Sequence, residues 1–183
     1  MKNKSPTSAW VVACALVLSV MTTSGASAQA RKGATQADIA ALLSEIDALK
    51  RIVPGQSHVM IDVDYHFSSL WFAAQNANWP LAAFYLNETK SNLNWAVRVR
   101  PVRKLSTGQP FDLQPMLQGI ENSSLTQLKA AIDQKDLKAF EAAYRQGMTE
   151  CHACHKLAEK PFLRPRIPEA PAARMIDMKP DSD

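Results

Sequence analysis

The chain has 183 residues, with 21 Lys and Arg against 17 Asp and Glu, and 3 cysteines. Its small positive charge does not indicate nucleic-acid binding, because removing Lys2 and Lys4 with a leader leaves 19 of the 21 basic residues against 17 acidic ones. Glycine is scarce and no region alternates apolar and polar residues with a period of two, so the chain is predicted to be all-α.

The first 30 residues have the pattern of a secretory signal peptide. Lys2 and Lys4 precede an apolar run over residues 9–21, and small residues lead to Ala28-Gln29-Ala30. The run is too short to span a membrane. We therefore expect cleavage after Ala28 or Ala30, a periplasmic protein and no stable membrane anchor. Lipidation at Cys14 is the less favoured alternative, since a lipobox cysteine ends an apolar run rather than opening it.

Residues 31–55 predict a single helix ahead of the main domain. Thr35 or Asp38 can cap this helix, and Pro54-Gly55 can end it. Its apolar residues recur at steps of three and four: Ile39, Leu42, Ile46, Leu49 and Val53. Two heptads are too few for a stable isolated coiled coil. A helix packed on the main domain and an arm that forms a homodimer both remain open.

Four more helices are predicted within residues 56–160. Apolar spacing places them at 57–77, 79–99, 112–133 and 136–158, with a break in the third near residues 119–123. A loop is expected at 101–110, and the proline-rich residues 161–183 should lie extended over the helices, because proline interrupts helices. The expected fold is an antiparallel four-helix bundle with an extra N-terminal helix and an extended C-terminal tail.

The most informative motif lies in the last of these helices: Cys151-His152-Ala153-Cys154-His155. Two thiols on one helical turn can form thioethers to the same porphyrin, and His155 can then bind the iron, so the motif predicts one covalent haem c. A redox dithiol belongs on a βαβ scaffold that this sequence lacks. A zinc site would need His58 and His66 as distant ligands.

The C-terminal position of this motif and the four-helix pattern of residues 57–160 resemble the class II cytochromes c, which include cytochrome c-prime. The extra helix and the long tail depart from the compact pattern of that family. The resemblance implies periplasmic electron transfer with a redox partner protein when the sixth iron position is filled. It implies binding of small gases such as NO or CO when that position is open. The sequence contains no recognisable catalytic constellation, so we do not expect an enzyme.

The first helix of an antiparallel bundle packs against the last, so the helix at 57–77 should face the haem. Met60 and His66 are its candidate sixth ligands, and they lie about 9 Å apart along the helix axis, too far for both to bind one iron. The resemblance favours Met60, because a methionine of the first helix supplies this ligand in family members with a filled site. Arg164 and Arg166 are expected near a haem propionate, since guanidinium pairs well with carboxylate. The cluster Arg98, Arg100, Arg103 and Lys104 could be solvated surface, a propionate partner or a docking patch for an acidic redox protein.

Overall fold

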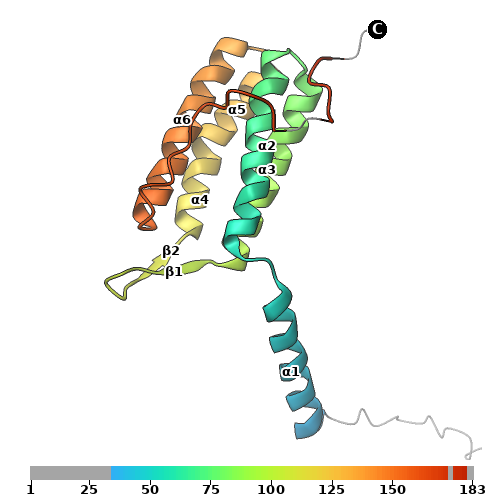
Figure 1. The fold of residues 1–183 in the computed structure, drawn as a ribbon, viewed down its shortest axis with the longest axis vertical. Helices are drawn as coiled ribbons and strands as arrows, with labels where there is room; N and C mark the ends of the chain where they lie inside the picture. The colour runs from blue at the N-terminus through green and yellow to red at the C-terminus, as the bar shows by residue number, and fades with distance from the viewer. Residues whose placement is uncertain (1–33, 173–174, 181–183) are drawn as a thin grey trace, which may run out of the picture. The chain divides into compact units, whose positions relative to one another are not determined.

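The computed structural model of the chain describes residues 34–172 and 175–180, so the predicted signal peptide lies outside the described part. Helices account for most of the secondary structure in this part, with one small two-stranded sheet (Figure 1). The all-α expectation is confirmed at that level. The chain divides into two compact units, with the boundary between Ala48 and Leu49. None of the described helices is long and apolar enough to cross a membrane.

Helix α1 (Gln36–Ile52) begins with a reciprocal cap, so both residues proposed as caps take part. The backbone N–H and the hydroxyl of Thr35 each donate to the Asp38 carboxylate at 2.8 Å, and the Asp38 N–H donates to the Thr35 hydroxyl at 3.2 Å. The apolar side chains of the predicted stripe are all exposed: Ile39, Leu42, Ile46, Leu49 and Val53.

The second unit contains α2 (Gln56–Gln75), α3 (Trp79–Val99), α4 (Gln114–Ile120), α5 (Thr126–Asp133) and α6 (Leu137–Leu157). These bounds agree with the predicted helices to within two residues. Asn78 caps the start of α3, with its side chain accepting the Leu81 N–H at 3.2 Å and Pro80 in the first turn. The break expected near residues 119–123 is instead a π-helical segment, η1 (Glu121–Leu125), which joins α4 to α5.

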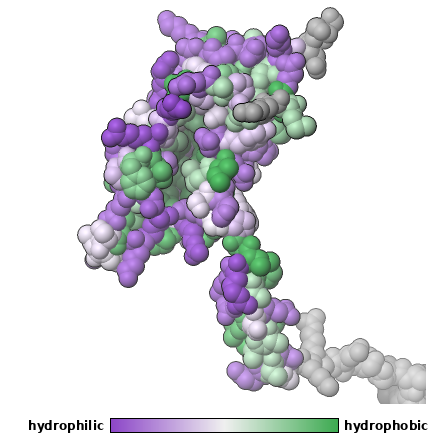
Figure 2. Space-filling model, in the orientation of Figure 1, coloured by the Kyte–Doolittle hydropathy of each residue, from purple (hydrophilic) through white to green (hydrophobic). Residues whose placement is uncertain are grey.

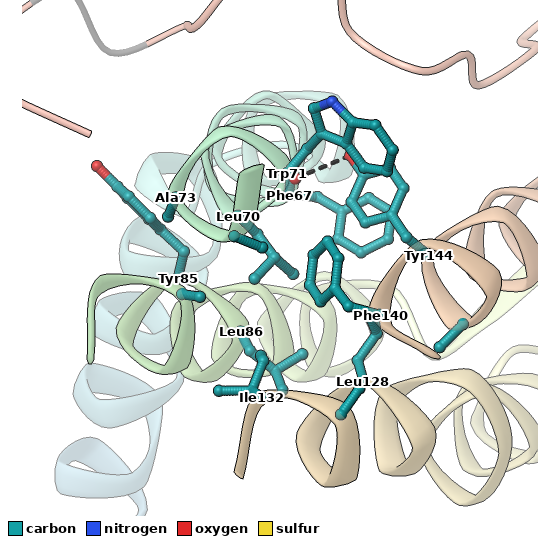
Figure 3. Close-up of a cluster of buried hydrophobic side chains, with 14 of the residues drawn as sticks. Phe67, Leu70, Trp71, Ala73, Tyr85, Leu86, Leu128, Ile132, Phe140 and Tyr144 are labelled. Atoms are coloured by element: carbon teal, nitrogen blue, oxygen red, sulfur yellow. Dashed lines mark hydrogen bonds between the residues drawn. The ribbon is translucent and has the colours of Figure 1, made fainter. Parts of the chain in front are cut away.

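Aromatic side chains hold α6 against α2 in the centre of this unit (Figure 3). The rings of Phe67 and Tyr144 stack with centroids 4.4 Å apart, and the Tyr144 hydroxyl donates to the Phe67 carbonyl at 2.9 Å. One turn further along α6, Gly147 permits the close approach of the two helices, because a Cβ there would lie 3.2 Å from the Phe67 ring. The core therefore fixes the position of α6 just before the cysteine motif.

The prediction of a loop at residues 101–110 was wrong. Strands β1 (Val102–Lys104) and β2 (Pro110–Asp112) form an antiparallel hairpin in which Arg103 lies opposite Phe111. Gly108 allows the turn, since its φ of +84° lies in the left-handed region that side chains disfavour. The hairpin is attached to the end of α6, where the Glu159 carboxylate accepts bonds from the Ser106 N–H at 2.7 Å and hydroxyl at 2.6 Å.

Residues 161–172 form neither helix nor strand, and they run from the end of α6 along the helices (Figure 1). Near the C-terminus, Met178 is buried in the main hydrophobic core. Next to it, the carbonyl of Lys179 accepts a hydrogen bond from the Asn78 side chain at 2.9 Å. The tail is thus attached at the turn between α2 and α3 as well as at α6.

Candidate cofactor-binding site

The cysteine motif occupies the last two turns of α6. Asp136 caps the start of this helix by accepting the Ala139 N–H at 3.0 Å. Both Cys151 and Cys154 are free thiols. The motif is therefore held on a regular helix whose two ends are defined by hydrogen bonds.

A cavity of about 1430 Å³ opens beside the motif. Cys151, Cys154 and His155 all line it, together with residues from α2, α3, the hairpin, α4 and the tail. Figure 2 shows this face of the molecule hollowed, with hydrophobic residues visible inside the hollow and hydrophilic ones around it. Pockets for drug-sized ligands usually have volumes of roughly 300–1,000 Å³, so this cavity has room for a large planar cofactor.

The two thiols are held in their neutral form. Burial, followed by the neighbouring Cys154 and Glu150, raises the pKa of Cys151 to about 12. Burial also raises the pKa of Cys154, and the positive charge of Arg103 opposes this effect. Redox-active and metal-binding cysteines require lowered pKa values, typically at helix N-termini, whereas these thiols lie near a helix C-terminus. The electrostatics of the site therefore do not favour a redox dithiol.

His155 is oriented by the tail. Its Nδ1 atom lies 2.9 Å from the Leu163 carbonyl oxygen. A carbonyl oxygen can only accept a hydrogen bond, so Nδ1 carries the proton and Nε2 of the neutral ring keeps a lone pair. Histidines that bind metals commonly donate their second ring nitrogen to a carbonyl in this way. His155 thus has the tautomer that an iron ligand needs.

The two candidate sixth ligands lie in different surroundings. Met60 lines the same cavity as the cysteines and His155, whereas His66 is not among the residues lining it. The His66 ring instead contacts Tyr65 at 4.9 Å and Tyr85 at 6.0 Å, measured between ring centroids. Its Nδ1 atom is buried without a hydrogen-bond partner. Of the two residues, the structure brings only Met60 together with the motif.

Cationic side chains surround the cavity. Six of them line it: Arg100, Arg103, Lys104, Lys160, Arg164 and Arg166. Arg166 is paired with Glu169 at 3.0 Å on the exposed surface. Arg103 is half-buried and donates to Gln56, which itself donates to the Ala96 carbonyl at 3.0 Å. Arg103 is therefore better supported than Arg166 as the partner of an anion. The sequence pointed to Arg103 through its position in the basic cluster after α3.

The sequence indicates no role for His152, which lies between the two cysteines of the motif. In the structure its Nε2 atom lies 3.0 Å from the Pro161 carbonyl oxygen, so it binds the tail. No sequence pattern predicts this contact, because it depends on how the chain reverses its direction after α6. Residues 34–172 and 175–180 contain no group of three or more His, Cys, Asp or Glu side chains arranged to hold a metal ion.

Comparison of the chain with protein-family models, with curated proteins and with solved structures finds no match in any of the three. The functional argument therefore rests on the residues of the motif and on the cavity around them. Both belong to the unit that follows Ala48.

Proposed function

We propose that this chain is an exported monohaem c-type cytochrome that transfers electrons in the periplasm. The observation that carries the proposal is the convergence of four residues on one cavity: Cys151, Cys154, His155 and Met60. The cysteines would hold the porphyrin, His155 would bind the iron through Nε2, and Met60 would supply the sixth ligand. A bound haem would provide one-electron exchange between ferric and ferrous iron.

The cations around the cavity fit the two propionates of a haem. A carboxylate removed from water requires a hydrogen-bonded or charged partner. Arg103 at the hairpin, with Arg164 and Arg166 in the tail, offers guanidinium groups for this purpose. The propionates would neutralise only part of the positive charge, so we expect a redox partner with an acidic docking face.

We further propose that α2, α3, α4–η1–α5 and α6 form the antiparallel four-helix bundle of the class II cytochromes c, with residues 161–183 as an extended tail. The contacts of α2 with α3, of α5 with α6, and of α2 with α6 support this arrangement. A role for the exposed apolar face of α1 in a homodimer remains part of the proposal.

Binding of a small gas is the second candidate function. Its supporting observation is the apolar surface that Val63, Phe67 and Leu93 contribute to the same cavity as the motif. An open iron position against such a surface favours a small neutral diatomic ligand. The two functions differ in whether Met60 binds the iron.

A direct test begins with production of the chain alongside a cytochrome c maturation system. Haem-peroxidase staining of a denaturing gel should reveal covalent haem, and the double variant Cys151→Ala/Cys154→Ala should lose the stain. Retention of the stain in that variant would refute the proposal. Met60→Ala should then convert a low-spin ferric spectrum to a high-spin one and increase carbon monoxide binding. His66→Ala, on the same helix, is the matched control. Spectra unchanged by Met60→Ala would favour the gas-binding function.

A further inference from the structure

The end of α6 reverses sharply at Glu159. This residue has a φ of +59°, and the Lys160 N–H donates to the His155 carbonyl at 2.8 Å. The Leu163 N–H then donates to the Lys160 carbonyl at 3.0 Å. These bonds bring the backbone of residues 161–163 back to the turn of helix that carries the cysteine motif.

Two histidines of the motif meet this returning backbone. His152 and His155 are three residues apart, so they share one side of the helix. Their partners, the carbonyls of Pro161 and Leu163, are two residues apart in the non-helical segment. The Leu163 N–H bond to the Lys160 carbonyl closes residues 160–163 into a turn, which carries both acceptor carbonyls. The two hydrogen bonds, of 3.0 Å and 2.9 Å, therefore hold this one turn against one side of α6.

The pair selects opposite tautomers for the two rings. Because both acceptors are carbonyl oxygens, His152 must carry a proton on Nε2 and His155 must carry one on Nδ1. Only His155 is thereby left with an unprotonated Nε2 when both rings are neutral. Only His155, of these two residues, also lines the cavity.

We infer that His152 is a positioning residue for the iron ligand. Its Nε2–H bond holds Pro161 in place, so that the carbonyl of Leu163, two residues on, fixes the ring orientation and tautomer of His155. The effect at the iron rests on the proposed haem function. A hydrogen bond to the second ring nitrogen makes a histidine ligand more basic, which stabilises ferric over ferrous iron. Loss of the bond should therefore raise the midpoint potential.

A purely structural role for His152 would make a different prediction. If His152 only tied the tail to the surface, its loss would lower stability and leave the His155 ring unaffected. The positioning role instead predicts a change in two properties of His155: the protection of its Nδ1 proton and the potential of the iron it binds. Both can be measured without an activity assay.

The test compares three variants of the full-length haem protein. His152→Ala removes the donor, whereas His152→Gln keeps an amide N–H that can reach the Pro161 carbonyl. Leu157→Ala is the control, because Leu157 is an exposed neutral residue in the same last turn. Potentiometric titration gives the midpoint potential. Nitrogen-15 NMR of the ferrous protein gives the tautomer of His155 and the exchange rate of its Nδ1 proton.

We expect His152→Ala to raise the midpoint potential and to speed exchange of the His155 Nδ1 proton, because that proton loses its fixed acceptor. His152→Gln should stay close to the unmodified protein, and Leu157→Ala should match it. Values unchanged in His152→Ala, or an equal change in His152→Gln, would overturn the inference. If His152→Ala does not fold, Pro161→Gly provides the second test, because it keeps the carbonyl but frees the backbone, and it should move both readouts in the same direction.

Failure of the haem proposal can be distinguished from failure of the positioning role of His152. A chain that carries no covalent haem would still report the tautomer of His155 by NMR, and His152→Ala would still be expected to disturb it. A chain with haem whose potential and Nδ1 proton ignore His152 would refute the positioning role alone.

Discussion

Gly147 allows the contact between α6 and α2 to be tested quantitatively. A Cβ at this position would lie 3.2 Å from the Phe67 ring and 3.4 Å from the Ser124 hydroxyl oxygen. The ring cannot move aside easily, because it stacks on Tyr144, whose hydroxyl binds the Phe67 backbone. Insertion of a methyl group into such a packed site costs about 1–3 kcal/mol.

Alanine also has a higher helix propensity than glycine, by about 1 kcal/mol, and this gain must be separated from the steric penalty. Gly119 provides the control, since it is a helical glycine whose Cβ would meet nothing within 4 Å. Gly119→Ala should therefore stabilise the protein by about 1 kcal/mol. The difference between the two variants isolates the steric penalty, and we expect Gly147→Ala to be less stable than Gly119→Ala by about 1–3 kcal/mol.

Urea denaturation followed by circular dichroism measures this difference directly. Each variant is compared with the unmodified chain under the same conditions, with the slope of unfolding free energy against urea checked for constancy. Equal stabilisation by the two substitutions would show that α6 and α2 are not in close contact at Gly147, and the position assigned to the cysteine motif would be wrong with it.

Three further predictions concern the site and the tail. In the chain without haem, alkylation of Cys151 should be slow at neutral pH and should accelerate as the pH rises toward 12, and fast alkylation near pH 7 would contradict this expectation. The folded pKa of Cys151 lies above the ordinary value of 9.0. The contribution of the neutral thiol to stability is therefore present below pH 9.0 and is lost as the pH rises. Arg103→Gln should raise the pKa of Cys154 further, because the Arg103 charge lowers it, while Arg164→Gln should leave that pKa unchanged; thiol titration of the two variants separates these outcomes. Met178→Ala should destabilise the protein by about 2 kcal/mol or more, since the Met178 side chain is buried in the core. Met175→Ala is the matched control, because Met175 is exposed. Equal unfolding midpoints for the two variants would show that the end of the tail is not packed in the core.

The helices of the second unit could be predicted because their information is local. Apolar side chains recur at helical spacing, and Asn78, Pro80 and Asp136 mark helix starts through their own side chains and rings. The hairpin was missed because its strands are only three residues long and depend on a left-handed Gly108. The contacts of His152 and His155 with the tail depend on the positive φ of Glu159, a residue with no local preference for that conformation.

Only part of the candidate site could be predicted from the sequence. The motif itself singles out Cys151, Cys154 and His155, because the proposed covalent haem would require that spacing. Helical spacing alone does not separate Met60 from His66, since both lie on the apolar side of the same helix, and only the family resemblance favoured Met60. The structure separates them through the rotation of α2, which directs Met60 to the cavity while His66 contacts Tyr65 and Tyr85.

The attachment of Met178 in the core affects how the opposite end of the tail behaves when it detaches from α6. A segment fixed at one end samples a large volume, whereas a segment fixed at both ends keeps its middle close to the surface at high effective concentration. The burial of Met178 and the bond from Asn78 to Lys179 therefore limit how far Leu163 can move from His155 when their hydrogen bond breaks. A break in one of these attachments leaves the other in place, which favours return of the freed end.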